Sequence, residues 1–160
     1  MRMINMLHYI CERISLSSYH IEKLLEDFMC PKLVSLILSK NPLIYPIPKK
    51  FLIRLNALRV LDLSHAQIES LPTSVTQLTL LEFLTLNSTN IKELPLTICS
   101  LSRFKFSDLS DYKVLTSFPS EMSKLTLLKR LNLSMGMEKD LNDPTNVVAL
   151  RISQILWSSF

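Results

Sequence analysis

Glycine is almost absent from this chain of 160 residues, in which Gly136 is the only one. A nucleotide-binding P-loop needs several glycines, because only glycine lets the backbone approach a phosphate group closely. The scarcity therefore excludes a P-loop, and it argues against tight hairpin turns that depend on glycine. The turns of this chain are left to Asn, Ser, Asp and Pro.

Cysteine is also scarce, with residues only at positions 11, 30 and 99. The number is odd and the spacing is wide, so the sequence lacks the close cysteine pairs that bind zinc or cross-link a small secreted domain. This pattern favours a reducing compartment, and we expect a cytoplasmic protein without a metal site. Cys30 precedes Pro31 and is expected to be a turn residue, whereas Cys99 is expected to be a small buried residue on the convex side.

Long hydrophobic runs and charge of a single sign are missing as well. No stretch reaches the roughly 18 apolar residues that a membrane-spanning helix needs. Residues 3–10 lack a small-residue cleavage site and are soon followed by Glu12 and Arg13, so we expect no signal peptide. The net charge is +4, but basic and acidic residues alternate along the chain. Because nucleic-acid binding needs a surface of one sign, a mixed solvated surface is the better interpretation.

A hexad of the form Leu-x-x-Leu-x-Leu returns along the chain at a nearly constant interval. It is clearest at residues 58–63, 81–86 and 128–133, and the apolar residues that follow the first two hexads share one spacing. Looser units begin at 11, 33 and 104, where Cys11 and Ser107 occupy leucine positions. The starts at 11, 33, 58, 81, 104 and 128 give intervals of 22, 25, 23, 23 and 24 residues, which are typical of leucine-rich repeats.

This repeat predicts an α/β fold, a leucine-rich-repeat solenoid. The central Leu-x-Leu of each hexad is expected to form a short strand that points its leucines inward, and the strands are expected to stack in a parallel concave sheet. A Leu-Pro pair such as Leu71-Pro72 then turns the chain away, because proline cannot pair within a sheet. Apolar residues three apart, such as Val75 and Leu78, suit short helices or irregular turns on the convex side.

The ladder divides the chain into three expected segments. Residues 1–10 form a lead-in, residues 11–137 form the leucine-rich-repeat domain, and residues 138–160 leave the ladder. In this last segment Asp143-Pro144 is followed by apolar residues up to Trp157, which predicts a helix that caps the final repeat. The alternative is a tail produced by a truncated or misjoined gene, in which apolar residues such as Phe160 are left uncovered.

The residues between the inward leucines are the candidates for function, because the repeat places them side by side on the concave face. The third hexad position reads Arg13, Ser35, Val60, Phe83, Phe106 and Arg130. Its three successive apolar residues form either a stripe that binds a partner or local cross-strand packing, and the sequence leaves both open. In the second position, Arg59, Glu82 and Lys105 alternate in sign, as lateral ion pairs require. The predicted partner-binding residues are Arg59, Val60, Glu82, Phe83, Lys105, Phe106 and Arg130.

No catalytic chemistry is predicted. The histidines, His8, His20 and His65, are scattered along the chain, and no nucleophile motif accompanies them. His65 lies close in sequence to Asp62 and Ser64, but a catalytic triad depends on positioned geometry and not on sequence proximity. We therefore expect a non-enzymatic protein with no cofactor, metal ion or small-molecule substrate, whose partner is another protein and not a nucleic acid.

Several segments between roughly residues 11 and 135 share a recognisable pattern, namely Arg13-Ile-Ser-Leu16, Cys30-Pro-Lys-Leu33 and residues 58–64, 68–72 and 89–95. They resemble the start of the repeat domain in plant nucleotide-binding leucine-rich-repeat disease-resistance proteins of the coiled-coil subclass. This resemblance implies an intracellular immune receptor whose repeat domain binds a pathogen effector, a host protein or the receptor's own nucleotide-binding domain. Because the P-loop is missing, we expect a fragment, a truncated paralogue or a partial gene model. The alternative function is a structural or regulatory scaffold that docks onto other domains of its own receptor.

Overall fold

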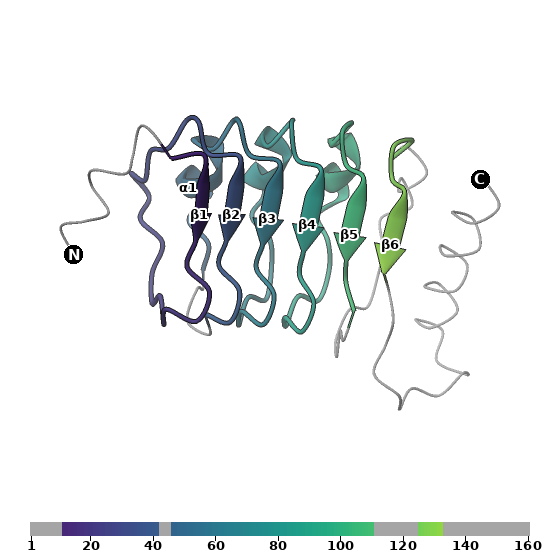
Figure 1. The fold of residues 1–160 in the computed structure, drawn as a ribbon. Helices are drawn as coiled ribbons and strands as arrows, with labels where there is room; N and C mark the ends of the chain where they lie inside the picture. The colour runs from purple at the N-terminus through teal and green to yellow at the C-terminus, as the bar shows by residue number, and fades with distance from the viewer. Residues whose placement is uncertain (1–10, 42–45, 111–124, 133–160) are drawn as a thin grey trace, which may run out of the picture.

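Six short parallel strands lie side by side in one sheet. Between strands, the chain returns behind the sheet (Figure 1). The structure is a computed structural model that describes residues 11–41, 46–110 and 125–132, with the backbone alone at 106 and 130–132. The strands are β1 (Arg13–Ser15), β2 (Ser35–Ile37), β3 (Val60–Asp62), β4 (Phe83–Thr85), β5 (Phe106–Asp108) and β6 (Arg130–Asn132). Their order in the sheet is their order in the sequence, which confirms the predicted parallel solenoid.

The strands are aligned at the same hexad position throughout the sheet. Val60 pairs with Phe83, and Phe83 pairs in turn with Phe106. The same alignment continues to Arg13 and Ser35 at one end and to Arg130 at the other. A shift of one residue would turn every inward leucine to the opposite face, so burial of the leucines holds this register.

A single ladder of leucines fills the space between the sheet and the returning segments. In the unit around β4, Leu81, Leu84 and Leu86 all have 0% of their surface exposed. The equivalent leucines of the neighbouring units are buried in the same way, so each unit covers the apolar face of the next. Ser107 occupies the leucine position of β5 and is itself 2% exposed.

The returning segments carry short helices on the side opposite the open face of the sheet (Figure 1). These are α1 (Lys49–Ile53), η2 (Thr73–Gln77) and η3 (Leu96–Ser100), and η2 and η3 are 3-10 helices. Each begins directly after a proline, which is held in an extended conformation. The 3-10 form fits the apolar spacing, because Leu78 N–H donates to Val75 O, three residues earlier, at 3.1 Å. The prediction of short convex helices is confirmed.

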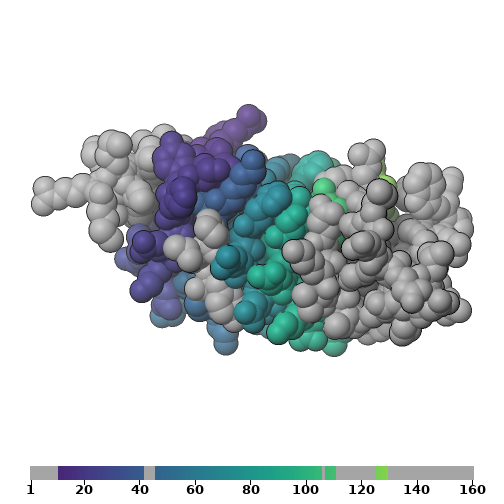
Figure 2. Space-filling model, turned by 90° about the horizontal axis from the view of Figure 1, so that it is seen from below, coloured from purple at the N-terminus to yellow at the C-terminus, as the bar shows by residue number. Residues whose placement is uncertain are grey.

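A turn of one type follows four successive strands, and it uses left-handed backbone without glycine. The residue two positions after the last leucine of the hexad has a positive φ of 56–62°, and its N–H donates to a carbonyl of the next unit at 2.8–3.2 Å. These residues are Ser18, Lys40, His65 and Ser88. Figure 2 looks onto the edge where the strands end, and there the successive units appear as side-by-side bands of colour.

His65→Gly is expected to raise the free energy of unfolding by about 0.5–1 kcal/mol. The Cβ atom of any other L-residue is crowded in the left-handed conformation, and glycine has none. Gln67→Gly is the matched control, because Gln67 is exposed nearby but is not among the positive-φ residues. The control is expected to lose stability through the larger freedom of the unfolded chain. Urea denaturation measures both, and a loss for His65→Gly would contradict the assigned strain.

Cys30 is a turn residue, as the sequence predicts, because its carbonyl oxygen accepts a hydrogen bond from Leu33 N–H at 3.0 Å. Its side chain is also buried in the core, with 0% exposure, which the sequence analysis did not predict. The reason is its place in the repeat: like Leu55 and Leu78, it lies three residues before the next hexad, where the side chain points inward. Cys99 was expected to be buried and is only half-buried, because Ile98 takes the inward position.

Some expectations fall outside the described residues. The lead-in at 1–10 and the tail at 138–160, with its expected capping helix, both belong to this group. The bounds of the repeat domain at 11–137 stay predictions. Within the described part of the chain, no helix is both long and apolar enough to cross a membrane.

Candidate functional site

The open face of the sheet lies opposite the short helices, and we call it the concave face. Its centre line is the third-position row, in which the strand register makes Val60, Phe83 and Phe106 immediate neighbours. Among the described side chains, Arg13 is exposed, Val60 is half-buried and Phe83 is 40% exposed. Phe106 and Arg130 lie in the same row by their backbone positions in β5 and β6. The structure thus aligns all the third-position residues that the sequence predicts.

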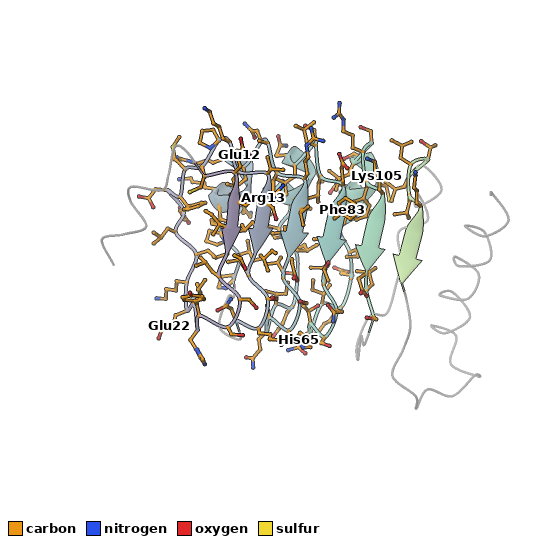
Figure 3. The ribbon with its side chains drawn as sticks, viewed as in Figure 1. Glu12, Arg13, Glu22, His65, Phe83 and Lys105 are labelled. Atoms are coloured by element: carbon orange, nitrogen blue, oxygen red, sulfur yellow. The ribbon has the colours of Figure 1, made fainter. Side chains whose placement is uncertain are left out.

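Phe83 is the large apolar residue at the middle of this face. Among the described side chains, the other exposed large hydrophobic residues lie in turns, loops or the short helices, and Phe83 alone lies in a strand. Figure 3 shows it on β4, beside Lys105 at the start of the next strand. An aromatic ring on rigid backbone offers a large apolar area at a small loss of conformational entropy. Its position therefore suits an anchor for a partner.

An ion-pair triad borders Phe83 along the edge where the strands begin. Arg59 Nη1 lies 3.0 Å from Glu82 Oε1, and Lys105 Nζ lies 2.8 Å from Glu82 Oε2. Both carboxylate oxygens of Glu82 are engaged, and its side chain is only 12% exposed. The lateral ion pairs expected from the alternating signs are confirmed. Because two cations share one carboxylate, the triad carries a net charge of +1. We call this edge of the concave face, where the strands begin, the rim.

The triad makes the stability of the fold sensitive to acid. The hydrogen bond from Lys105, together with the charges of Lys105 and Arg59, lowers the pKa of Glu82, against the opposing effect of burial. A carboxylate with a depressed folded-state pKa stabilises the fold above its unfolded pKa of about 4.3, and this contribution disappears as the pH falls through the folded pKa. Glu82→Gln is therefore expected to lower the unfolding midpoint at pH 7 and to match the parent protein in strong acid.

Thermal unfolding between pH 7 and pH 2 measures this difference. Glu93→Gln is the control, since it neutralises an exposed carboxylate outside the triad. A gap between Glu82→Gln and the parent that stays constant over the whole pH range would show that packing, and not charge, explains the effect.

The fifth-position residues lie at the edge where the strands end, and they stabilise the turns that follow. Asp62 Oδ1 accepts hydrogen bonds from Ser64 N–H at 2.9 Å and from Ser64 Oγ at 2.7 Å, and Asp108 Oδ1 accepts one from Ser110 N–H at 3.0 Å. The Ser64 hydroxyl thus donates to Asp62 and not to His65, which lies exposed at this edge of the sheet (Figure 3). The three residues form a stabilised turn and not a triad geometry. No cluster in the described part of the chain combines His, Cys, Asp or Glu in a way that would hold a metal ion.

The predicted set leaves out one residue that belongs to the same surface. Lys129 occupies the second hexad position beside Lys105, is exposed, and donates its backbone N–H to Lys105 O at 2.8 Å. The signal was present in the sequence, because the second-position row already reads Lys105 and then Lys129. The cationic rim therefore extends one strand beyond the triad.

A family model and one solved structure agree with this architecture, and a second solved structure shows a weaker similarity. A family model described as leucine-rich repeat region matches residues 15–159. A solved leucine-rich-repeat protein of Leptospira interrogans is similar at 34% sequence identity with a TM-score of 0.60, over 67% of this chain and 26% of that one. An internalin of Listeria monocytogenes shows 17% identity and a TM-score of 0.34, over 69% of this chain and 44% of that one.

No curated protein sequence matches the chain significantly. The chain spans about a quarter of the length of the leptospiral protein, at 26% coverage. The family match covers most of the sequence and includes five of the six strands in full. The chain belongs to the leucine-rich-repeat family.

Proposed function

We propose that this chain is a non-catalytic module that binds a protein partner through the concave face of its sheet. The observation that carries the proposal is the third-position row, with Phe83 40% exposed between Val60 and Phe106. Stacked repeats characteristically use such an extended surface for binding. A partner that covers Phe83 removes apolar surface from water, which gains about 25 cal/mol for each Å² buried.

The rim residues add specificity to this anchor. Arg59 and Lys105 are already held by Glu82 at 3.0 and 2.8 Å, so less side-chain freedom is lost when a partner meets them. Their net positive charge favours a partner that places a carboxylate beside the apolar contact, and such charges act mainly on association rate and on the choice of partner. In this proposal, the surface consists of Arg59, Val60, Glu82, Phe83, Lys105, Phe106 and Arg130.

A two-hybrid screen against an expression library from the source organism tests the surface. Each partner found with the parent chain is then measured against Phe83→Ser, Phe106→Ser and Leu96→Ser. Leu96 is the matched control, because it is 66% exposed but lies in η3 on the convex side. We expect about tenfold weaker binding or more for Phe83→Ser, the loss of an aromatic anchor, and parent-like binding for Leu96→Ser. Partners that bind Phe83→Ser as tightly as the parent would rule out this face.

We further propose that the module comes from a plant intracellular immune receptor, acts in the cytoplasm and contributes to defence against pathogens. The resemblance over residues 11–135 supports this origin. It implies that the partner is a pathogen effector, a host protein or the receptor's own nucleotide-binding domain. The upstream genomic reading frame tests the origin directly. A P-loop encoded there would support the receptor, and an unrelated upstream gene would count against it.

A scaffold that docks onto neighbouring receptor domains is the second candidate. It is favoured by apolar residues that are exposed away from the concave face, namely Leu96 on η3 and Ile53 on α1. Co-expression with the nucleotide-binding domain of a coiled-coil-subclass receptor separates the two functions. Association that needs no foreign ligand, is lost in Leu96→Ser and survives in Phe83→Ser would favour the scaffold.

A further inference from the structure

Two cysteines that are far apart in the sequence meet inside the first repeat. The Sγ atom of Cys30 donates a hydrogen bond to the carbonyl oxygen of Cys11 at 3.2 Å, across 19 positions of the chain. Cys30 is buried in the core, and Cys11 packs against that core while remaining half-exposed. The Cys11 side chain is also near enough for its charge to raise the pKa of Cys30.

The repeat pattern shows that this pair is specific to the first unit. Cys11 occupies the first hexad position, which is Leu33 and Leu58 in the next two units. Cys30 lies three residues before a hexad, as Leu55 does, and both accept a hydrogen bond from the N–H three residues later, at 3.0 and 2.9 Å. Both core positions are leucine in the next two units and cysteine in the first. The fold therefore places two thiols where the next units place apolar side chains.

The first unit is also less tightly packed than the units around β2, β3 and β4 in the described part of the chain. Ile14, Leu16, Ile21 and Leu24 are only half-buried, whereas Leu36 in the same sheet position of β2 is fully buried. A cavity of about 310 Å³ lies among these side chains. A unit whose apolar side chains are less buried is held by fewer contacts, so it opens more readily than its neighbours. A covalent bond within this unit would act where the non-covalent contacts are fewest.

We propose that Cys11 and Cys30 form a reversible disulfide by exchange with a low-molecular-weight disulfide, such as oxidised glutathione, and that this bond closes the coil of the first repeat. The bond would join the segment just before β1 to the end of the returning segment of the same unit. This site is independent of the concave face and of its partner.

The exchange proceeds in two balanced steps. The thiolate of Cys11, the more accessible of the two, attacks one sulfur of oxidised glutathione, and one glutathione thiolate leaves. The Cys30 thiol then gives up its proton to solvent, and its thiolate attacks the Cys11 sulfur of the mixed disulfide and releases the second glutathione thiolate. The two protein thiols are oxidised, and one oxidised glutathione is reduced to two thiols that take up the two protons. Burial raises the pKa of Cys30, and the neighbouring Cys11 adds to this shift, so Cys30 suits the resolving position.

Intact-mass analysis of the full chain after incubation with oxidised glutathione tests the bond. Remaining thiols are alkylated after denaturation, and tryptic peptides are mapped. We expect one alkylated thiol, at Cys99, and a cross-linked pair of peptides covering residues 3–13 and 24–32. Cys99→Ala is the control variant and is expected to form the same cross-link. Stable glutathione adducts on Cys11 without the cross-link, or a bond that involves Cys99, would overturn the proposal, as would three unreacted thiols.

Oxidation should also change the first repeat physically. We expect the melting temperature to rise by roughly 5–10 °C, because a disulfide restricts the unfolded chain. Hydrogen exchange should slow at Leu16 and Ser18, whose N–H groups bond to Ile37 O and Ser39 O. Cys11→Ala, which leaves the buried Cys30 in place, should show neither response to oxidised glutathione. Equal responses in this variant and in the parent would contradict the assignment of the effect to this bond.

Discussion

Leu84→Ala is expected to lower the free energy of unfolding by about 2–5 kcal/mol, the usual range for a buried leucine. Leu84 lies in the middle of β4 with 0% exposure, and its strand neighbours in the ladder are Leu61 and Ser107. In a stacked repeat a cavity at this place weakens the contacts with the units on both sides, so the loss reaches beyond one unit. Urea denaturation followed by circular dichroism measures the change.

The neighbouring residue provides the control for Leu84. Thr85 belongs to the same strand, but it points to the concave face and is half-buried. Thr85→Ala is therefore expected to lower stability by about 1 kcal/mol or less. Similar losses for the two variants would mean that the strand does not alternate between core and surface in the way described.

Asn41→Ala is expected to lower the free energy of unfolding by about 2–4 kcal/mol, since each buried polar group left without a partner costs about 1–3 kcal/mol. The Asn41 side chain is buried and ties the first unit to the second. Its Nδ2 donates to Leu16 O at 2.7 Å and to Leu38 O at 2.9 Å, and its Oδ1 accepts from Ile21 N–H at 2.9 Å. Removing the amide leaves these backbone groups without their partner.

Two further variants separate hydrogen bonding from bulk at this position. Asn41→Asp keeps an acceptor for the Ile21 N–H but loses both donors and buries a charge, so it should be no more stable than the alanine variant. Asn90→Ala changes an exposed asparagine and should fall within about 0.5 kcal/mol of the parent. An Asn41→Ala protein as stable as Asn90→Ala would show that the bonds across the first two units contribute little.

The repeat period made most of the fold predictable from the sequence. Because the hexads recur every 22 to 25 residues, the strand positions, the parallel register and the row from Arg13 to Arg130 all follow from counting. The ion pairs of Glu82 with Arg59 and Lys105 follow as well, since the register makes residues 23 positions apart neighbours. Alternation along each strand determines which residues face outward, and the register places these charged residues next to one another. Both ion pairs can therefore be predicted from the sequence.

Other features depend on the path of the chain between strands, which counting does not provide. To predict that Cys30 lies near Cys11, one must know where the returning segment of the first unit re-enters the core. The separation of 19 residues does not give this position. The hydrogen bonds of Asn41 depend on a turn whose left-handed residue, Lys40, is not glycine. The sequence also leaves open whether Phe83 binds a partner or packs against its neighbours. Alternation predicts that its side chain faces outward, but it does not predict the exposed fraction of that side chain.

The most direct test of the central claim is a measurement of hydrogen bonds between successive units by nuclear magnetic resonance. Through-bond couplings across N–H···O=C identify donor and acceptor residues without reference to side chains. The described fold predicts couplings from Leu63 N–H to Thr85 O and from Leu86 N–H to Asp108 O, which lie 2.9 Å apart in each case. Couplings that join these amides to carbonyls of their own unit, or to the next unit shifted by two residues, would contradict the stacked register and the continuous concave face.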